Sequence, residues 1–391
     1  MSDLSSNIAV YVKELDVKTS RTEEALEPMG AAASYLALVH TSTDREVDAT
    51  IMRYNRLSTT GPNWQSHLVS LSGDLERYLS EESRRYYQYQ RCPSTDLTGV
   101  KMFDQLRGPT MTIRSLADFR DNFENFGGSA LKNMDWSNVG VAGGSVLACL
   151  TTSEFGEAVR NSDIDLFIWG LGVQDMQRKL ESIKTTIIAN VPHFAYTYVV
   201  ERSAGAITFI PRVQENGRKI QVVLRAYTTP AAVLSSFDLD PACAFFDGEQ
   251  VWLSLRAVRA FYTGYTTTVG AISSSFAARI VKYATRGYGV RVRPEEGDPD
   301  MEELLLTMQS AMRKKVAAVA EAYTNLPWMK TANFRRVFNT TKSQASNNWT
   351  HSFSALASLA ALWNLAHATG RIGELMDEVG AASHIYGMYE G

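Results

Sequence analysis

Two aspartates, Asp163 and Asp165, stand at the head of an apolar run that ends at Trp169. Successive side chains of a strand alternate between its two faces, so both carboxylates point to one side while Ile164 and Leu166 enter the core. Like charges this close raise each other's pKa, which makes the pair costly without a cation. Magnesium binds carboxylate and phosphate oxygens together, so the pattern predicts a strand that holds a metal ion.

A glycine turn precedes this strand. Residues 138–142 form an apolar run that predicts a strand, and Gly143, Gly144 and Ser145 follow it directly. Glycine allows backbone N–H groups to approach a phosphate, the serine hydroxyl adds a donor, and the helix that starts here directs its positive end to the same place. We expect the turn to bind a nucleoside triphosphate and the two aspartates to hold two Mg²⁺ ions, or Mn²⁺ in their place, which clamp an in-line displacement.

The order of strand, Gly-Gly-Ser turn, helix and Asp-x-Asp strand resembles the signature of the nucleotidyltransferase superfamily, which includes polymerase beta, poly(A) polymerases and oligoadenylate synthetases. The resemblance implies that Asp163 and Asp165 are catalytic metal ligands and that the turn holds the triphosphate. It rests on residues 138–170 alone. The 17 residues between Ser145 and Asp163 exceed the usual spacing, so residues 151–161 look like an inserted loop. A βαβ-like connection with a solvated aspartate pair is the alternative interpretation.

A third carboxylate is expected on the strand predicted at 219–227, because active members of that superfamily carry one there. Gln221 stands at the position instead, and an amide is a weaker magnesium ligand that takes no proton near neutral pH. Asp238 and Asp240 again have strand spacing, and we assign Asp238 as the substitute metal ligand from an adjacent strand. The alternative is that an aspartate beside Pro241 starts a turn.

The length of 391 residues favours two or three domains. We expect an α+β protein in which a nucleotidyltransferase-like mixed sheet is flanked by helical regions at both ends of the chain. The boundaries are a mostly helical N-terminal region at 1–110, the core at 111–262 and a helical C-terminal domain at 263–391.

Within these regions the apolar periodicity predicts several elements. We expect helices at 67–91, 115–126, 173–189, 273–286, 301–323 and 352–379, strands at 195–201, 206–211 and 219–227, and a hairpin around Asp247-Gly248. The 67–91 segment mixes arginines with tyrosines, which suits nucleic-acid binding, but packing against a neighbour is the favoured interpretation.

One face of the predicted 273–286 helix is basic. Arg279 and Lys282 lie there with Arg286, and we expect the first two to reach the triphosphate, with a solvated helix face as the alternative. The stretch from Ala244 to Val290 also looks like a fungal and viral group of nucleotidyltransferase-fold proteins. The helices further along either close over nucleotide and acceptor or form an oligomerisation platform, and the basic segment 329–348 reads as a loop between them.

Composition limits the classes of function. The net charge of −3 gives no overall nucleic-acid footprint, and three widely spaced cysteines suit a reducing compartment without a disulfide framework. No apolar run approaches ~18 residues, and the first residues are unlike a signal peptide. We therefore expect a cytoplasmic protein without membrane contact, or a component of a viral particle in the host cytoplasm.

Two classes of function remain. The first is a magnesium-dependent nucleotidyltransferase that moves a nucleoside monophosphate from a triphosphate to a hydroxyl of a nucleic acid, a protein or a small alcohol. The second is an inactive protein on the same fold, serving as a nucleotide-binding module or a structural component such as a fungal virus coat or protrusion protein, in a homo-oligomer or viral assembly. The aspartate pair favours the first class and Gln221 favours the second.

Overall fold

The computed structural model describes residues 46–52, 63–76, 80–83, 86–103, 107–152, 162–213, 217–267, 276–292 and 370. They belong to two compact units, the first within Met1–Arg91 and Pro109–Tyr262, the second within Cys92–Gly108 and Thr263–Gly391. The helices predicted at 301–323 and 352–379 and the basic segment 329–348 lie outside the described residues. None of the described helices is long and apolar enough to cross a membrane.

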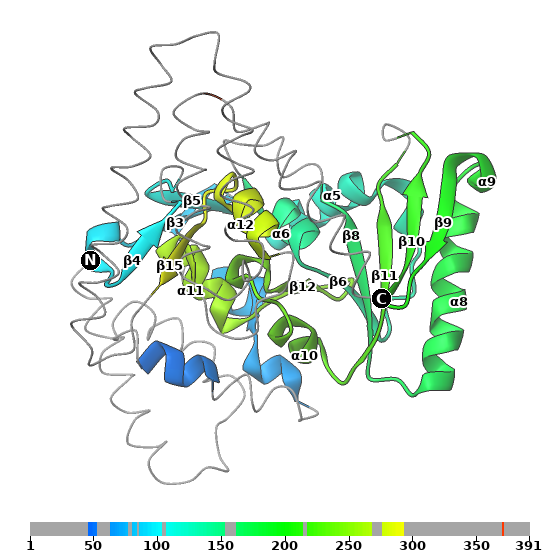
Figure 1. Ribbon diagram of the computed structural model, residues 1–391, viewed down its shortest axis with the longest axis horizontal. Helices are drawn as coiled ribbons and strands as arrows, with labels where there is room; N and C mark the ends of the chain where they lie inside the picture. The colour runs from blue at the N-terminus through cyan, green and yellow to red at the C-terminus, as the bar shows by residue number, and fades with distance from the viewer. Residues whose placement is uncertain are drawn as a thin grey trace, which may run out of the picture. The chain divides into compact units, whose positions relative to one another are not determined.

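The first unit is built on a mixed sheet, which has eight strands within the described residues (Figure 1). From one edge to the other they are β1 (Val69–Ser70), β13 (Val251–Leu253), β12 (Ala244–Phe246), β6 (Val139–Ala142), β8 (Ile164–Trp169), β11 (Ile220–Tyr227), β10 (Ala206–Pro211) and β9 (Tyr198–Arg202). β8 and β11 run parallel, and every other neighbouring pair is antiparallel. The expected α+β class with a mixed sheet is confirmed.

The centre of this sheet is closely packed. All four residues of β6 are buried, and Ile164, Leu166 and Ile168 of β8 are fully enclosed. A Cβ atom at Gly140 would lie 2.2 Å from Cζ of Phe245 on the neighbouring strand, so a larger residue does not fit there. The apolar runs on either side of the glycine turn therefore form the middle of the core, as the sequence predicts.

Helices complete the first unit. They are α5 (Leu116–Gly127), α6 (Gly144–Leu150), α8 (Val173–Asn190), α9 (Phe194–Thr197), α10 (Pro230–Ser235) and α11 (Leu255–Thr263), with 3-10 turns at η1 (Trp64–His67), η4 (Gly128–Leu131) and η6 (Asp240–Ala242). The helix predicted at 115–126 is confirmed in α5, and Ser115 Oγ caps it by accepting a hydrogen bond from Asp118 N–H at 3.2 Å. Phe119 and Phe123 are buried against Phe246 of β12, with ring centroids 5.1 and 4.9 Å away.

The helix predicted at 67–91 is wrong. This stretch instead holds β1, a single π-helical turn η2 (Leu71–Leu75), β2 (Ser80–Ser83) and β3 (Tyr86–Gln90). β3 belongs to a second sheet, in the order β2, β3, β5 (Thr110–Arg114) and β7 (Thr151–Thr152). Tyrosine-rich segments favour strands when a partner strand is at hand, and β5 supplies five pairs to β3. The start of the presumed inserted loop is likewise ordered as β7.

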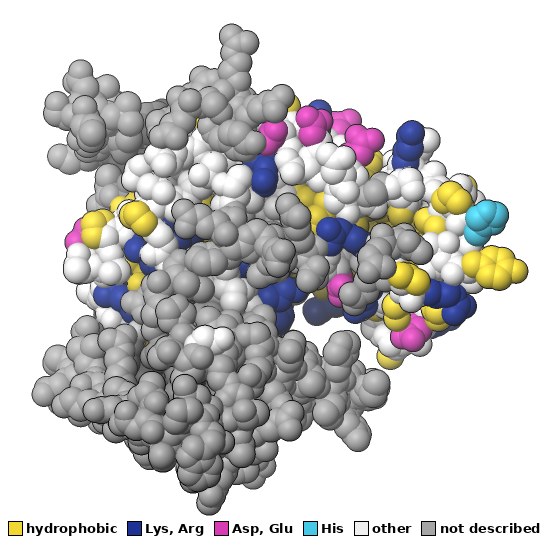
Figure 2. Space-filling model, turned by 90° about the horizontal axis from the view of Figure 1, so that it is seen from above, with side chains coloured by type: hydrophobic (Ala, Val, Ile, Leu, Met, Phe, Trp, Pro, Cys, Tyr) yellow, Lys and Arg dark blue, Asp and Glu magenta, His cyan; other side chains and the backbone are white. Residues whose placement is uncertain are grey.

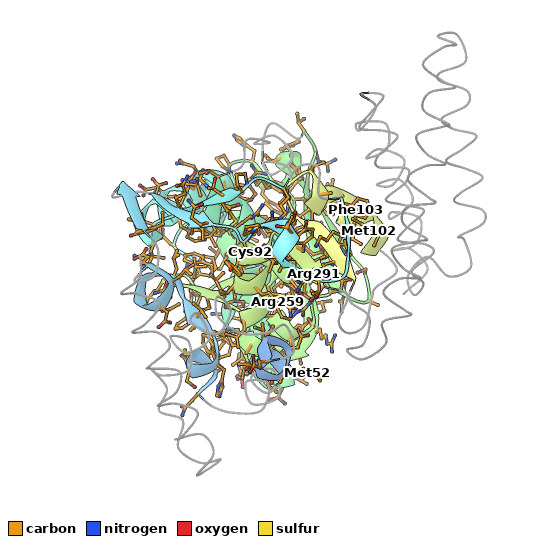
Figure 3. The ribbon with its side chains drawn as sticks, turned by 90° about the vertical axis from the view of Figure 1, so that its left-hand side faces the viewer. Met52, Cys92, Met102, Phe103, Arg259 and Arg291 are labelled. Carbon is orange, nitrogen blue, oxygen red and sulfur yellow. The ribbon has the colours of Figure 1, made fainter. Side chains whose placement is uncertain are left out.

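The second unit contains a three-stranded sheet as well as a helix in its described part. The strands are β14 (Tyr265–Thr267), β15 (Gly289–Val292) and β4 (Val100–Met102), accompanied by α12 (Phe276–Ala284) and the turn η3 (Ser94–Asp96). Figure 3 labels Cys92, Met102, Phe103 and Arg291 around this sheet, and all four side chains are buried.

Candidate functional site

Strand register brings the predicted site segments to one end of the main sheet. Asp165 of β8 is the Cα partner of Ala142 on β6 and, on its other side, of Gln221 on β11. Gly143 directly follows Ala142, so the glycine turn begins beside Asp165. The turn, the aspartate pair and Gln221 therefore meet on three neighbouring strands, as the predicted order of elements requires.

The turn depends on glycine. Gly143 has φ 90° and ψ −140°, a conformation that side chains disfavour, and α6 begins at the next residue. Its N–H donates to the Ala244 carbonyl at 3.0 Å and its own carbonyl accepts from Leu147 N–H at 3.1 Å. No side chain caps α6 within the described residues. The first N–H groups of α6 are thus the donors that a phosphate would meet.

Ser145 is fully enclosed. Its side chain is 0% exposed, and its Oγ has no hydrogen-bond partner among the described residues. Buried hydroxyl groups are normally paired, so this orphaned donor is unusual. The hydroxyl has no exposed surface that a triphosphate could touch in this structure. The predicted contact between Ser145 and a triphosphate therefore stays a prediction.

Asp163 is paired with a lysine. Lys219 Nζ lies 3.0 Å from Asp163 Oδ2, and the two side chains remain 34% and 42% exposed. The Lys219 carbonyl also accepts a hydrogen bond from Ile164 N–H at 2.9 Å, which aligns the starts of β11 and β8. Lys219 is not among the site residues that the sequence motifs predict. Its position two residues before Gln221, on the same face of the strand, is the signal that was available.

A second cation, Arg218, lies near the same carboxylate. Its Nε donates to the Phe126 carbonyl at 2.6 Å, and its guanidinium lies 3.5 Å from the centre of the Phe126 ring. Burial lowers the pKa of Arg218, while the negative charge of Asp163 acts in the opposite direction. Because an arginine stays charged in proteins, Arg218 adds positive potential around Asp163.

Asp238 and Asp240 are not on a strand, so that prediction is wrong. They follow α10, and Asp240 opens the 3-10 turn η6 with Pro241 behind it, which agrees with the alternative of a turn. Proline has no N–H for a strand ladder, which explains the outcome. Both side chains are buried. Asp238 was assigned as a metal ligand because it was expected on an adjacent strand, and the structure has no strand at this position.

Asp240 is held by two arginines. Its carboxylate accepts from Arg256 Nε at 2.7 Å and from Arg259 Nη2 at 3.1 Å, and Arg259 also pairs with Asp48. Asp240 is 0% exposed and both guanidinium groups are nearly enclosed. The two arginines bond both oxygens of Asp240. The carboxylate therefore belongs to a buried ion-pair cluster of the first unit and does not bind a cation.

No group of three or more His, Cys, Asp and Glu side chains is arranged to hold a metal ion within the part of the chain that the structure describes. The set of Asp163, Asp165 and Asp238 therefore stays a prediction. Magnesium is often bound through one or two protein carboxylates with water and substrate phosphates as the other ligands. The pair Asp163 and Asp165 fits that mode, in which the metal arrives with a phosphate.

Arg279 and Lys282 lie on α12 in the second unit, and both side chains are partly exposed. Their expected contact with a triphosphate stays a prediction.

Comparison with known proteins gives one family. Residues 115–263, which run from the cap of α5 to the end of α11, match the model of Gad2, described as Gabija anti-defense 2 family protein. The match covers less than half of the chain. The chain is also 24% identical over 201 residues to an uncharacterised protein, R883, of Acanthamoeba polyphaga mimivirus. That alignment takes in 48% of this chain and 43% of the mimivirus protein, so the chain spans less than half of this relative. No solved structure matches.

The resemblance to the nucleotidyltransferase superfamily, and to its fungal and viral group, is therefore wrong as a family assignment. The family model that matches the core is that of the Gabija anti-defense 2 proteins, and no nucleotidyltransferase family is shown. A Gly-Gly-Ser turn and an Asp-x-Asp strand are short motifs that recur on unrelated sheets. A viral relative does agree with the expected viral context.

Proposed function

We propose that this chain is a viral anti-defense protein whose core acts as a magnesium-dependent nucleotidyltransferase. One observation carries the proposal: the register of β6, β8 and β11 sets Asp163 and Asp165 beside the Gly143 turn, inside the segment that is similar to the anti-defense family. The chemistry is argued from these side chains and not from membership of an enzyme family.

Each residue has a role in this proposal. Asp163 and Asp165 hold the metal, and the N–H groups after Gly143 face the phosphates. When bound, the metal neutralises charge that develops on the transferred phosphoryl group. An acceptor hydroxyl forms a bond to the α-phosphorus while the bond to the leaving pyrophosphate breaks. Gln221 takes no proton, so the neighbouring Asp165 carboxylate is the group that receives the proton of the hydroxyl.

The acceptor belongs to the host defense in this proposal. A nucleic acid or a protein of the defense system would be inactivated when a nucleotide is added to one of its hydroxyl groups. Action takes place in the cytoplasm of the infected cell, without contact with a membrane. Figure 2 shows Lys and Arg as well as Asp and Glu side chains among the described residues. The net charge of the chain is −3, which gives no overall positive field, so a protein acceptor is favoured over a long nucleic-acid duplex.

Calorimetric titration with ATP, GTP, CTP and UTP, with and without Mg²⁺, tests the site. Magnesium-dependent binding should occur in the natural protein and be lost in Asp163→Ala/Asp165→Ala. The matched control is Asp175→Ala/Glu181→Ala, which removes two exposed carboxylates of α8 and should bind as the natural protein does. Equal binding by both double variants would rule out the aspartate site.

Virus plating tests the biological role. Cells that carry a Gabija defense should regain sensitivity to a restricted virus when they express this protein, and Asp163→Ala/Asp165→Ala should abolish the effect. If the natural protein restores virus growth and the double variant, at an equal protein level, does not, the result supports an enzymatic anti-defense protein. Absence of any rescue contradicts the anti-defense role.

A non-catalytic anti-defense protein is the second candidate. Lys219 occupies one oxygen of Asp163, and Gln221 stands beside Asp165 where a third carboxylate would complete a metal site. These two observations favour a core that binds a defense protein without chemistry. Rescue of the virus that survives the double variant would favour this candidate.

A further inference from the structure

Lys219 and Gln221 form a row that faces the aspartate pair. On the parallel strands β11 and β8, Gln221 is the Cα partner of Asp165, and Lys219 bonds Asp163 two residues earlier. Among the described residues, the site therefore combines two carboxylates with one ammonium group and one amide, and the guanidinium of Arg218 lies near Asp163 as a second cation. Its net charge is lower in magnitude than that of a site with two or three free carboxylates, which weakens its attraction for a bare divalent cation.

The lysine is held loosely. Lys219 and Asp163 are both about one-third exposed or more, and partly exposed ion pairs contribute little to stability. The lysine side chain is a flexible stem with a compact charge and three donors, so it can turn from one anion to another. Arg218 contrasts with it, since the Phe126 carbonyl and ring fix its guanidinium.

We propose that Lys219 pairs with Asp163 in place of the metal until a metal–nucleotide complex arrives, and that its ammonium group then leaves Asp163 and pairs with a phosphate of that nucleotide. The inference rests on the proposed function and adds an order of binding to it. The bare cation meets a site that Lys219 has already neutralised. The metal–nucleotide complex brings phosphate oxygens that accept the displaced ammonium group, so both charges stay paired.

The test compares two affinities in Lys219→Met. Electron paramagnetic resonance measures free Mn²⁺ binding without nucleotide, and calorimetry measures binding of the Mn²⁺–nucleotide complex. We expect the affinity for free Mn²⁺ to rise about tenfold, because Asp163 loses its competing cation, and the affinity for the complex to fall about tenfold, because a phosphate contact is lost. A structural role for Lys219 would lower both affinities together.

Two variants serve as controls. Lys219→Arg keeps the charge and should preserve the low affinity for free Mn²⁺. Lys184→Met removes a lysine of α8 that pairs with Glu181 at 3.1 Å, and should change neither affinity. If Lys219→Met fails to fold, as judged by circular dichroism, Lys219→Gln replaces it.

Failure of this inference can be told apart from failure of the proposed function. If the natural protein binds the Mn²⁺–nucleotide complex through Asp163 and Asp165 but Lys219→Met shows no gain for free Mn²⁺, the inference is overturned and the function stands. If the natural protein binds no nucleotide, the proposed function is contradicted. The proposed movement of the Lys219 ammonium group to a phosphate is then contradicted as well.

Discussion

Two of the Asp-x-Asp motifs in this chain, Asp163/Asp165 and Asp238/Asp240, have the same spacing and opposite surroundings. Asp163 lies at the head of a central strand, is 42% exposed and is paired with a single lysine. Asp240 lies in a 3-10 turn, is 0% exposed and is bonded by two arginines. A carboxylate that is bonded by two buried arginines is part of the framework, meaning the set of residues that maintain the fold. A carboxylate that one partly exposed lysine holds remains available for a ligand.

The energetic consequence differs accordingly. Removing one partner of a buried ion pair leaves an uncompensated charge in the interior, whereas an exposed pair is screened by water and salt. Arg259 is labelled among the interior side chains in Figure 3, and it pairs with Asp48 as well as Asp240. The second motif thus links the segment 46–52 to η6 and α11.

The largest effect is expected at the buried motif. Asp240→Ala should lower the free energy of unfolding by about 3–5 kcal/mol, because it leaves Arg256 and Arg259 buried without their shared carboxylate. Urea denaturation followed by circular dichroism measures the change. A loss below about 1 kcal/mol would mean that water reaches the arginines, and the contrast between the two motifs would disappear.

The turn beside the first motif tests a different constraint. Gly143→Ala should lower stability by about 1–3 kcal/mol, because its φ of 90° disfavours any side chain. Space does not limit the change, since the nearest atom to an added Cβ, in Phe237, is 3.6 Å away. Gly172→Ala is the control: φ is −73° there and nothing lies within 4 Å of the new Cβ, so thermal unfolding should be nearly unchanged.

The exposed motif should matter little for stability. Asp163→Ala should change the free energy of unfolding by roughly 0–1 kcal/mol, and added salt should reduce even this difference. The same variant should lose magnesium-dependent nucleotide binding. Parallel urea titrations at low and high ionic strength check the first part and calorimetry checks the second. A stability loss as large as that of Asp240→Ala would show that Asp163 is a framework residue.

Buried cysteines offer a smaller test of the framework around both motifs. Burial raises the pKa of Cys149 on α6 to about 12 and that of Cys243, next to η6, to about 11. Both thiols should therefore stay unreactive toward iodoacetamide at pH 8 and react only after unfolding in urea. Mass spectrometry of the alkylated protein gives the number and place of modified thiols. Rapid labelling of Cys149 in the folded protein would mean that α6, the helix that follows the glycine turn, opens without global unfolding.

The sequence predicts the local elements of the site well. Period-two and period-3.6 patterns predict β6, α6 and β8 within a residue or two, and the apolar periodicity of 115–126 predicts α5. These features depend on neighbours along the chain. The helix predicted at 67–91 failed because its tyrosines pair with β5, for example Tyr86 with Arg114 and Tyr89 with Met111, which lie further along the chain.

The environment of each aspartate could not be predicted in the same way. Lys219 reaches Asp163 only because β11 lies parallel to β8 in one register, and the arginines of Asp240 come from α11. Both facts are tertiary. The two Asp-x-Asp motifs read alike until the partner strands are known, which is why one of them was wrongly expected on a strand.

The smallest expected change in stability comes from Gln221→Glu, which makes the first motif more like a three-carboxylate metal site. The new carboxylate would stand beside Asp165 in the parallel register, and Lys219 lies close enough in sequence to offset its charge. Stability should fall by only a few tenths of a kcal/mol, as for like charges on neighbouring strands. Free Mn²⁺ should bind more tightly, by about tenfold, because a carboxylate is a stronger ligand for a hard cation than an amide. Gln174→Glu on the exposed start of α8 is the control and should not change Mn²⁺ affinity. If Gln221→Glu does not raise the affinity for free Mn²⁺, the side chains at this end of the sheet are not arranged around a cation. The Asp163/Asp165 motif would then be part of the framework, as the Asp238/Asp240 motif is.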